Sequence, residues 1–227
     1  MKKILFTISF LTAGLMLACN SSNEANKKAE EIAQKEITPV EVPSQDGLEK
    51  AYFASGCFWC VEAIYESVKG VKESISGYSG GHTQNPTYES SNTGTTGHAE
   101  AVEIIYDPTL VSFETLVDVY FGSQNITQVN GQGPDRGSQY RSIIFYQNDA
   151  QKKIIENKIA ALEKELGEGS VAAQVLPFEK FWEGEAYHQD YEKRNPNNPY
   201  IQNVSIPRFK RFAKKYPELL KEDAMDH

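Results

Sequence analysis

Residues 50–60 read KAYFASGCFWC, and this stretch decides the local fold. The apolar residues 51–53 predict a short strand, which a glycine then interrupts. Apolar residues recur with helical spacing over 57–68, so a helix is expected directly after the glycine. Cys57 and Cys60 therefore lie one helical turn apart at the start of that helix, where residues three apart are neighbours.

Strand and helix patterns alternate along the rest of the chain, and long polar loops separate several of them. Further strands are expected at 71–78, 99–106, 139–146 and 172–176, and further helices at 113–121 and 149–166. Long loops in place of tight crossovers favour an α+β fold. We expect a two-layer sandwich around a mixed, mainly antiparallel sheet.

Residues 1–18 have the layout of a secretory signal peptide. Two lysines precede an apolar run, Ile4–Leu17, which is short for a membrane-spanning helix of ~20 residues. Cys19 follows Ala18 directly, and this resembles the lipobox of bacterial lipoproteins, in which the cysteine is acylated. The alternative is an ordinary signal peptide with a chance cysteine. Because an odd thiol is a liability in an exported protein, we expect a lipoprotein anchored in the cell envelope through Cys19.

Composition divides the remaining chain into a tether, one domain and a tail. Residues 19–47 are rich in Lys, Glu, Ala, Ser and Asn and poor in aromatics, so a flexible tether is expected. Residues 48–216 have the size and apolar content of one domain, and 217–227 are left as a C-terminal tail. The formal net charge of −8 argues against nucleic-acid binding, and contact with a membrane is expected through the lipid anchor only.

The cysteine pair indicates redox chemistry. The first turn of a helix is expected to stabilise a Cys57 thiolate, because unpaired N–H groups and the helix dipole favour an anion there. A disulfide to Cys60 would close a very small loop and be easily reduced.

Three other uses of the pair remain open. A zinc knuckle lacks a second ligand pair, and a structural disulfide would stabilise little in so small a loop. A thioredoxin-like dithiol is the serious alternative, although Phe58 and Trp59 are bulky for that motif. The residues alone therefore predict a thiol-based redox enzyme.

The stretch Gly56-Cys57-Phe58-Trp59 resembles the signature of the A-type peptide methionine sulfoxide reductases, which commonly read Gly-Cys-Phe-Trp-Gly. Further motifs follow in the family's order: Gly77-Tyr78-Ser79-Gly80-Gly81, Pro86-Thr87-Tyr88, Thr96-Gly97-His98-Ala99-Glu100, Asp135-Arg136-Gly137-Ser138-Gln139-Tyr140-Arg141-Ser142 and Ala186-Tyr187-His188-Gln189-Asp190-Tyr191. The resemblance covers about Lys50 to Tyr191. It implies reduction of the S epimer of methionine sulfoxide, free or in proteins and peptides, with no metal or organic cofactor.

The resemblance also implies a role for individual residues. Cys57 would attack the sulfoxide sulfur, and Glu100 would protonate the sulfoxide oxygen, which leaves poorly until it is protonated. Tyr88 and Tyr140 would hydrogen-bond that oxygen, and Asp135 would hold polar groups around the site.

Phe58 and Trp59 would form the apolar wall that receives the substrate's S-methyl group. By residue type alone these aromatics would be packing residues, and Glu100 would be a solvated strand glutamate.

Cys60 is the departure from the family, which commonly has glycine at this position. Many relatives carry a resolving cysteine near the C-terminus, but residues 209–227 contain none. We hypothesise that Cys60 condenses with a sulfenic acid on Cys57, and that a thioredoxin-type dithiol protein reduces the resulting disulfide. The other possible functions are an exported thioredoxin-like oxidoreductase and a lipoprotein that only binds ligands.

Overall fold

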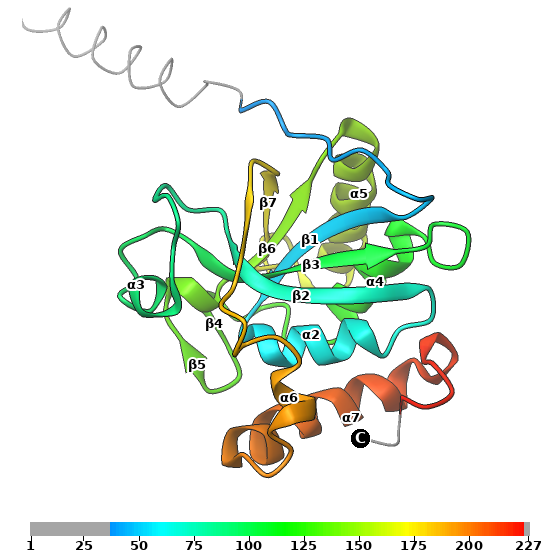
Figure 1. Cartoon of the computed structure of the whole chain (residues 1–227). Coiled ribbons are helices and arrows are strands. Elements are labelled where there is room, and N and C mark those ends of the chain that lie inside the picture. The colour runs from blue at the N-terminus through cyan, green and yellow to red at the C-terminus, as the bar shows by residue number, and fades with distance from the viewer. Residues whose placement is uncertain (1–36, 225–227) are drawn as a thin grey trace, which may run out of the picture. The chain divides into compact units, whose positions relative to one another are not determined.

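The computed structural model of the chain describes residues 37–224 (Figure 1). The predicted signal peptide, Cys19 and most of the predicted tether lie outside the described residues. Within the described range, no helix is both long enough and apolar enough to span a bilayer.

A six-stranded sheet forms the centre of the domain. Its strands are β1 (Glu49–Ser55), β2 (Val71–Ser79), β3 (Ala99–Tyr106), β6 (Ser142–Tyr146), β7 (Gln174–Pro177) and β8 (Phe181–Glu183). They lie in the order β7-β6-β1-β3-β2-β8, and every pair is antiparallel except β6 with β7. The predicted α+β fold with a mixed, mainly antiparallel sheet is confirmed.

Helices and short turns surround this sheet. The longer helices are α2 (Phe58–Glu66), α4 (Phe113–Gly122), α5 (Asp149–Leu166) and α7 (Ile206–Lys215). The shorter elements are α3 (Tyr88–Asn92), the hairpin β4 (Gly131–Gln132) and β5 (Asp135–Arg136), η1 (Ser138–Tyr140), α6 (Tyr191–Arg194), η2 (Ile201–Ser205) and η3 (Pro217–Leu219). Helix α2 packs on β2 and β3, and α7 packs on α2 from the other side (Figure 1).

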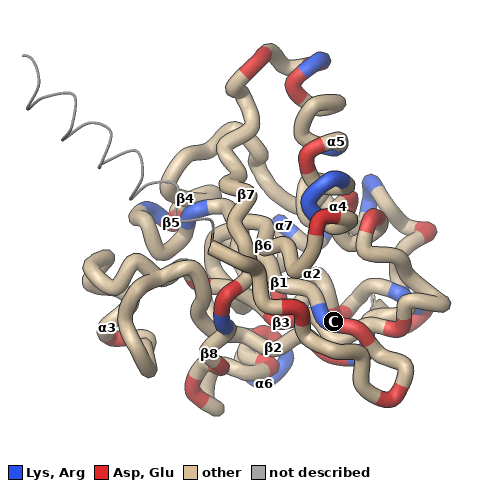
Figure 2. The backbone as a smooth tube through the Cα atoms, turned by 90° about the horizontal axis from the view of Figure 1, so that it is seen from above, with Lys and Arg blue, Asp and Glu red and all other residues tan. Residues whose placement is uncertain are grey.

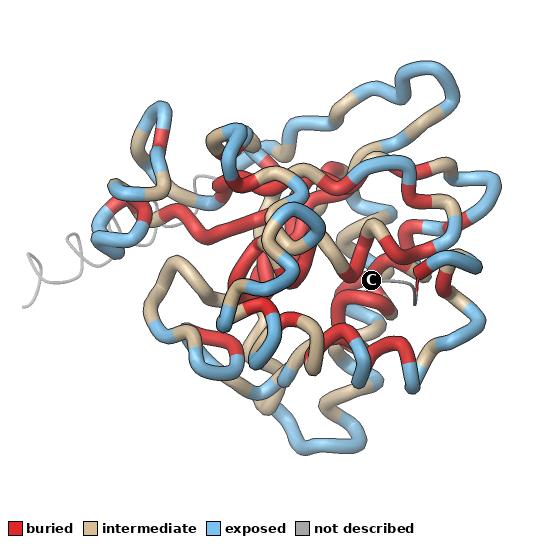
Figure 3. The backbone as a smooth tube through the Cα atoms, turned by 60° about the horizontal axis from the view of Figure 1, so that its bottom comes forward, coloured by how far each residue is buried: buried red, intermediate tan, exposed pale blue. Residues whose placement is uncertain are grey.

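The main apolar core lies between the sheet and its helices. Phe53 of β1 stacks on Tyr65 of α2 with ring centroids 5.2 Å apart, and it also contacts the ring of Phe113 in α4. The next residues of β1 in either direction, Tyr52 and Ala54, belong to a second, smaller cluster. Because β1 is buried on both faces, its residues form a continuous apolar run, and Figure 3 shows buried backbone through the middle of the domain.

The ordered domain is longer than the sequence predicted at both ends. Val40 N–H donates to Phe178 O (2.7 Å), so part of the predicted tether is bound to the domain. Leu220 and Ala224, which were assigned to the tail, are buried in the main core. The predicted tether and tail did not include these contacts, because isolated apolar residues in polar segments give no periodic signal.

Some local predictions differ from the structure. The strand expected at 139–146 is shorter, because 138–140 form a turn and Gly137 before it has φ +125°. Strand β8 and the hairpin β4–β5 are too short to show a periodic pattern. Acidic positions occur in the outer segments and also beside β2 and β3 (Figure 2), where Glu100 and Glu103 are buried.

Candidate active site

Cys57 lies at the tight turn between β1 and α2 and immediately precedes the first helical residue. Gly56 before it has φ +83°, and a Cβ at this position would lie 2.4 Å from Gln132 Cβ in β4. The turn therefore requires glycine for both its conformation and its close approach to the β4–β5 hairpin. It leaves the Cys57 side chain only 6% exposed.

Glu100 of β3 is bonded to the same turn. Its Oε2 accepts a hydrogen bond from Phe58 N–H (3.0 Å), and the residue is 2% exposed. Burial raises the pKa of Glu100 to about 8, although the hydrogen bond from Phe58 acts in the opposite direction. The buried carboxyl can therefore carry a proton at neutral pH beside the Cys57 thiol.

The two thiols have opposite environments. Burial raises the pKa of Cys57 well above its usual value, and its contacts with Cys60 and Glu100 add to this. A hydrogen bond from Cys57 lowers the pKa of Cys60 to about 7, with the Arg208 guanidinium helping against the cost of burial. The expectation that the helix start lowers the pKa of Cys57 is wrong. The first N–H of α2, that of Phe58, is already bonded to the Glu100 carboxyl.

An aromatic cluster surrounds Phe58. Its ring lies 4.8 Å from that of His188, 6.3 Å from that of Tyr88 and 6.1 Å from that of Trp59, between centroids. Phe58 is 1% exposed, whereas Tyr88 and Trp59 are half-buried and form the accessible part of the cluster. The structure thus brings the predicted apolar wall together next to Cys57.

Trp59 is held on two sides by the segment after β8. Its Nε1–H donates to His188 Nδ1 (3.1 Å), and its indole stacks on Tyr191 with centroids 3.7 Å apart. The hydrogen bond requires that Nδ1 of His188 carries no proton, and burial lowers the pKa of this histidine. The neutral imidazole therefore fixes the indole orientation.

Two tyrosine hydroxyls lie near the Glu100 carboxyl. Burial raises the pKa of Tyr140, with further contributions from Glu100 and Tyr88. Burial likewise raises the pKa of Tyr88, and Glu100 again contributes. Tyr140 Oη donates weakly to Asn92 Oδ1 (3.4 Å). Both hydroxyls are therefore protonated at neutral pH and can donate to an oxygen atom placed between them and Glu100.

Asp135 of β5 lies on the Cys60 side of this arrangement. Its Oδ2 accepts a hydrogen bond from Tyr200 Oη (2.6 Å), and Tyr200 Oη lies 3.8 Å from Cys60 Sγ. Burial raises the pKa of Asp135, partly offset by the Tyr200 hydrogen bond and by Arg208. Asp135 is thus linked to Cys60 through Tyr200, a residue that the sequence did not indicate, and its predicted role stays a prediction.

Arg208 and Glu185 are two more residues that sequence reasoning missed. Arg208 is buried, and its guanidinium donates to Ser55 O (2.9 Å) and Ser123 O (2.8 Å), which supports the strand end before Cys57. Glu185 accepts hydrogen bonds from Tyr78 Oη (2.8 Å) and the Tyr88 backbone N–H (2.9 Å). A cationic residue among apolar positions of a helix was the available signal for Arg208.

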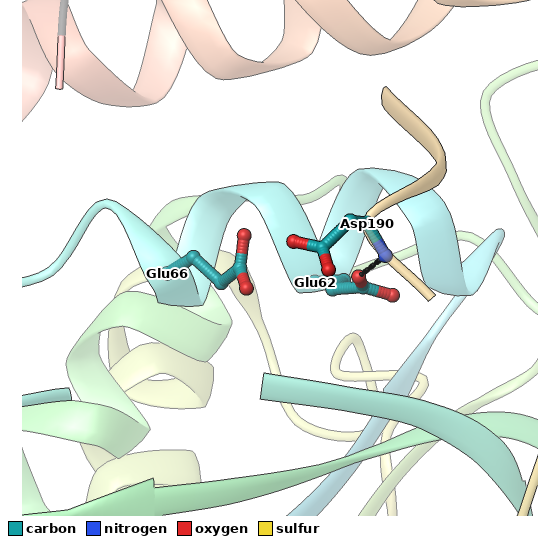
Figure 4. A group of neighbouring side chains, drawn as sticks. All are labelled: Glu62, Glu66 and Asp190. Atoms are coloured by element: carbon teal, nitrogen blue, oxygen red, sulfur yellow. Dashed lines mark hydrogen bonds between the residues drawn. The ribbon is translucent and has the colours of Figure 1, made fainter. Parts of the chain in front are cut away.

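Three carboxylates lie close together, two of them on α2 and one on the residue that precedes α6. Glu62, Glu66 and Asp190 place oxygen atoms close enough to share a cation (Figure 4). Asp190 N–H donates to Glu62, and Lys193 Nζ lies 2.7 Å from Glu66 Oε2 and 3.2 Å from Asp190 Oδ1. Because a lysine already supplies the positive charge, the group is an ion-pair network that joins α2 to the segment around α6.

Comparison with known proteins gives a consistent result. The family model for "Peptide methionine sulfoxide reductase" matches residues 49–220. The chain is 46% identical over 173 residues to MsrA of Pasteurella multocida, covering 76% of this chain and 99% of that protein. It is 45% identical over 174 residues to MsrA of Saccharolobus solfataricus, covering 77% and 98%.

Solved structures agree. Methionine sulfoxide reductase A of Corynebacterium diphtheriae superposes with a TM-score of 0.60 at 34% identity, covering 67% of this chain and 77% of that one. Reduced Mxr1 of Saccharomyces cerevisiae gives a TM-score of 0.60 at 28% identity, covering 71% and 92%.

Proposed function

The chain belongs to the peptide methionine sulfoxide reductase family, as an A-type member and an oxidoreductase, and we propose that it acts on the S epimer through Cys57. Its substrate is methionine sulfoxide, in proteins and peptides and as the free amino acid. The observation that carries the proposal is the buried Glu100 carboxyl, with a pKa raised to about 8, bonded to the backbone that follows Cys57.

The first step uses Cys57 and Glu100 together. Cys57 sulfur attacks the sulfoxide sulfur, while the proton that Glu100 holds passes to the sulfoxide oxygen. The hydroxyl group then moves from the methionine sulfur to the Cys57 sulfur, and the bond between the two sulfurs breaks, with its electron pair staying on methionine. The thiol proton of Cys57 restores the proton on Glu100. In sum, one thiol and one sulfoxide give a sulfenic acid on Cys57 and a methionine thioether.

The surrounding residues position the substrate. Phe58 and the fixed indole of Trp59 receive the S-methyl group, and the Tyr88 and Tyr140 hydroxyls donate to the sulfoxide oxygen. A methyl wall on one side and donors on the other distinguish the two epimers, because the wrong epimer would direct its oxygen at apolar rings.

Recycling begins at Cys60. Its thiol attacks the Cys57 sulfenic acid and releases water, leaving a Cys57–Cys60 disulfide, and Arg208 and Tyr200 favour the thiolate form of Cys60 in this step. A thioredoxin-type dithiol protein then returns both thiols to the reduced state. The same segment accounts for both half-reactions, which removes the need for a cysteine near the C-terminus.

The cellular location is a separate proposal that rests on residues outside the described range. The signal-like residues 1–18 and Cys19 support an exported lipoprotein that repairs oxidised methionine in the cell envelope. Mass spectrometry of the membrane fraction tests this: acylation of Cys19 is expected, and an unmodified N-terminus in the soluble fraction would contradict it.

The activity is tested with the separate S and R epimers of a methionine sulfoxide peptide and dithiothreitol. Turnover of the S epimer only is expected, and the Cys57→Ser variant should reduce neither. Equal turnover of both epimers would refute the proposed methyl wall, and activity in Cys57→Ser would refute the proposed nucleophile.

A further inference from the structure

Glu62 of α2 is a buried carboxyl that the sulfoxide chemistry does not use. It lies one helical turn after Trp59 and is 3% exposed. Its Oε1 accepts a hydrogen bond from the Asp190 backbone N–H (Figure 4), and its Oε2 accepts one from Ser76 Oγ of β2. Burial of a carboxyl costs free energy unless its oxygens have partners. The two bonds therefore hold Glu62 in a defined position between α2, β2 and the segment before α6.

The backbone at Asp190 is also held through its neighbour Gln189. The Gln189 side chain donates to Ser76 O (2.9 Å) and Gly184 O (3.1 Å), and it accepts from Ser76 N–H (2.9 Å). Asp190 has φ +50°, a left-handed conformation that is unfavourable for a residue with a side chain. Such a conformation persists where the surrounding structure determines it, and the bond from the Asp190 N–H to Glu62 is one of the contacts that do so.

The turn at Asp190 lies between the two residues that hold the Trp59 indole. His188 accepts the indole N–H (3.1 Å), and Tyr191 stacks on the indole with centroids 3.7 Å apart. A rotation of the backbone at Asp190 would move the rings of His188 and Tyr191 relative to each other. Both contacts with Trp59 therefore depend on this turn, and Glu62 acts on the indole through it.

We propose that Glu62 is a positioning residue for sulfoxide reduction: it fixes the turn at Asp190 and thereby sets the orientation of the Trp59 indole and the size of the S-methyl pocket. The inference rests on the proposed function, because it takes Trp59 as part of the wall that receives the methyl group.

This role requires hydrogen bonds from Glu62 but not its charge. Burial raises the pKa of Glu62 to about 7. A protonated carboxyl can still accept from the Asp190 N–H, while its O–H donates to Ser76 Oγ. Glutamine offers the same acceptor and donor, whereas leucine offers neither. Glu62→Gln should therefore preserve the turn, and Glu62→Leu should loosen it.

The first test measures how well the variants distinguish a methyl from an ethyl sulfoxide. The ratio of kcat/KM for methionine sulfoxide to kcat/KM for ethionine sulfoxide, both as S epimers, does not depend on the fraction of protein that is folded. Because one methylene in an apolar pocket is worth ~10-fold or more in discrimination, the ratio should fall ~10-fold in Glu62→Leu. It should keep the wild-type value in Glu62→Gln.

Glu66→Leu is the matched control on the same helix. It removes the ion pair with Lys193 and leaves the bond from the Asp190 N–H to Glu62 in place, so the ratio should again keep the wild-type value. An unchanged ratio in Glu62→Leu, or an equal fall in Glu62→Gln or Glu66→Leu, would overturn the proposal.

The second measurement follows the indole directly and needs no turnover. The chain contains two tryptophans, so a Trp182→Phe protein reports the fluorescence of Trp59 alone. Acrylamide quenching of this fluorescence should increase when Glu62→Leu is added and return to its starting value with Glu62→Gln. Unchanged quenching in the leucine variant would overturn the proposal.

Ser76→Ala replaces the leucine variant if that protein does not fold. It removes one of the two bonds to Glu62, so a smaller increase in quenching is expected, and no increase would overturn the proposal. A wild-type protein that reduces neither sulfoxide would refute the proposed function, and the fluorescence result would still decide the role of Glu62.

Discussion

The two sides of the first turn of α2 differ in their neighbouring residues and in the direction in which the thiol pKa is shifted. On the Cys57 side, the aromatic pair Phe58–Trp59 follows the cysteine in sequence, Glu100 has a pKa raised to about 8, and the thiol pKa is raised. On the Cys60 side, Asp135, Tyr200 and basic residues of α7 surround a thiol whose pKa is lowered to about 7. One helical turn thus separates two thiols with different neighbours.

Replacement of Cys57 should have the largest effect on sulfoxide reduction. We expect Cys57→Ser to abolish sulfoxide reduction, because a serine hydroxyl is a far weaker nucleophile, whereas Cys60→Ser should still reduce sulfoxide. A pre-steady-state assay of methionine formation compares the two variants. Equal loss in both would mean that the two sides do not have separate roles.

Glu100→Gln should give the next largest effect. Loss of a positioned acid lowers the rate of sulfoxide reduction by ~10²–10⁴-fold, while Cys57 remains open to alkylation. In the wild type, the acid is active when protonated and has a pKa of about 8, so the rate should fall as pH rises through about 8. The pH profile of both proteins shows whether this decline vanishes in the glutamine variant. A decline that persists there would assign it to another group.

Cys60→Ser separates the two half-reactions. One methionine per protein molecule is expected with a thioredoxin-type reductant, because the sulfenic acid on Cys57 then has no thiol partner. Quantitation of methionine against protein measures this stoichiometry. Several turnovers at the wild-type rate would show that the reductant attacks the sulfenic acid directly.

Tyr200→Phe should have the smallest effect, confined to the Cys60 side. Removal of the hydroxyl deletes the contacts with Asp135 and Cys60, and one hydrogen bond is worth about 1 kcal/mol, or roughly fivefold in rate. The pKa of Cys60, followed by pH-dependent alkylation, should rise, and disulfide formation should slow. The rate of sulfoxide reduction should stay the same, and a matching loss there would place Tyr200 on the Cys57 side as well.

The sequence indicated the residues on the Cys57 side better than those on the Cys60 side. Cys57, Phe58 and Trp59 fall in one short motif between a strand and a helix, and Glu100 lies in a strand of regular alternation. Tyr200 follows a polar Asn- and Pro-rich loop without periodicity, and Arg208 is distant in sequence, so only the fold brings them to Cys60.

The wrong pKa direction for Cys57 has a similar cause. The rule about helix starts is local, whereas the pKa of Cys57 is raised mainly by burial, which parts of the chain distant in sequence produce. Residue type alone favoured a solvated position for Glu100, whereas the structure buries it and bonds it to Phe58 N–H.

The most direct test of this division is to locate the oxidised sulfur after a single turnover. The Cys60→Ser protein is given one equivalent of the S epimer, treated with a reagent that traps sulfenic acids, and mapped by mass spectrometry. The account predicts one trapped sulfenic acid, on Cys57, for each methionine formed. Methionine formation with no modification of Cys57 would contradict it.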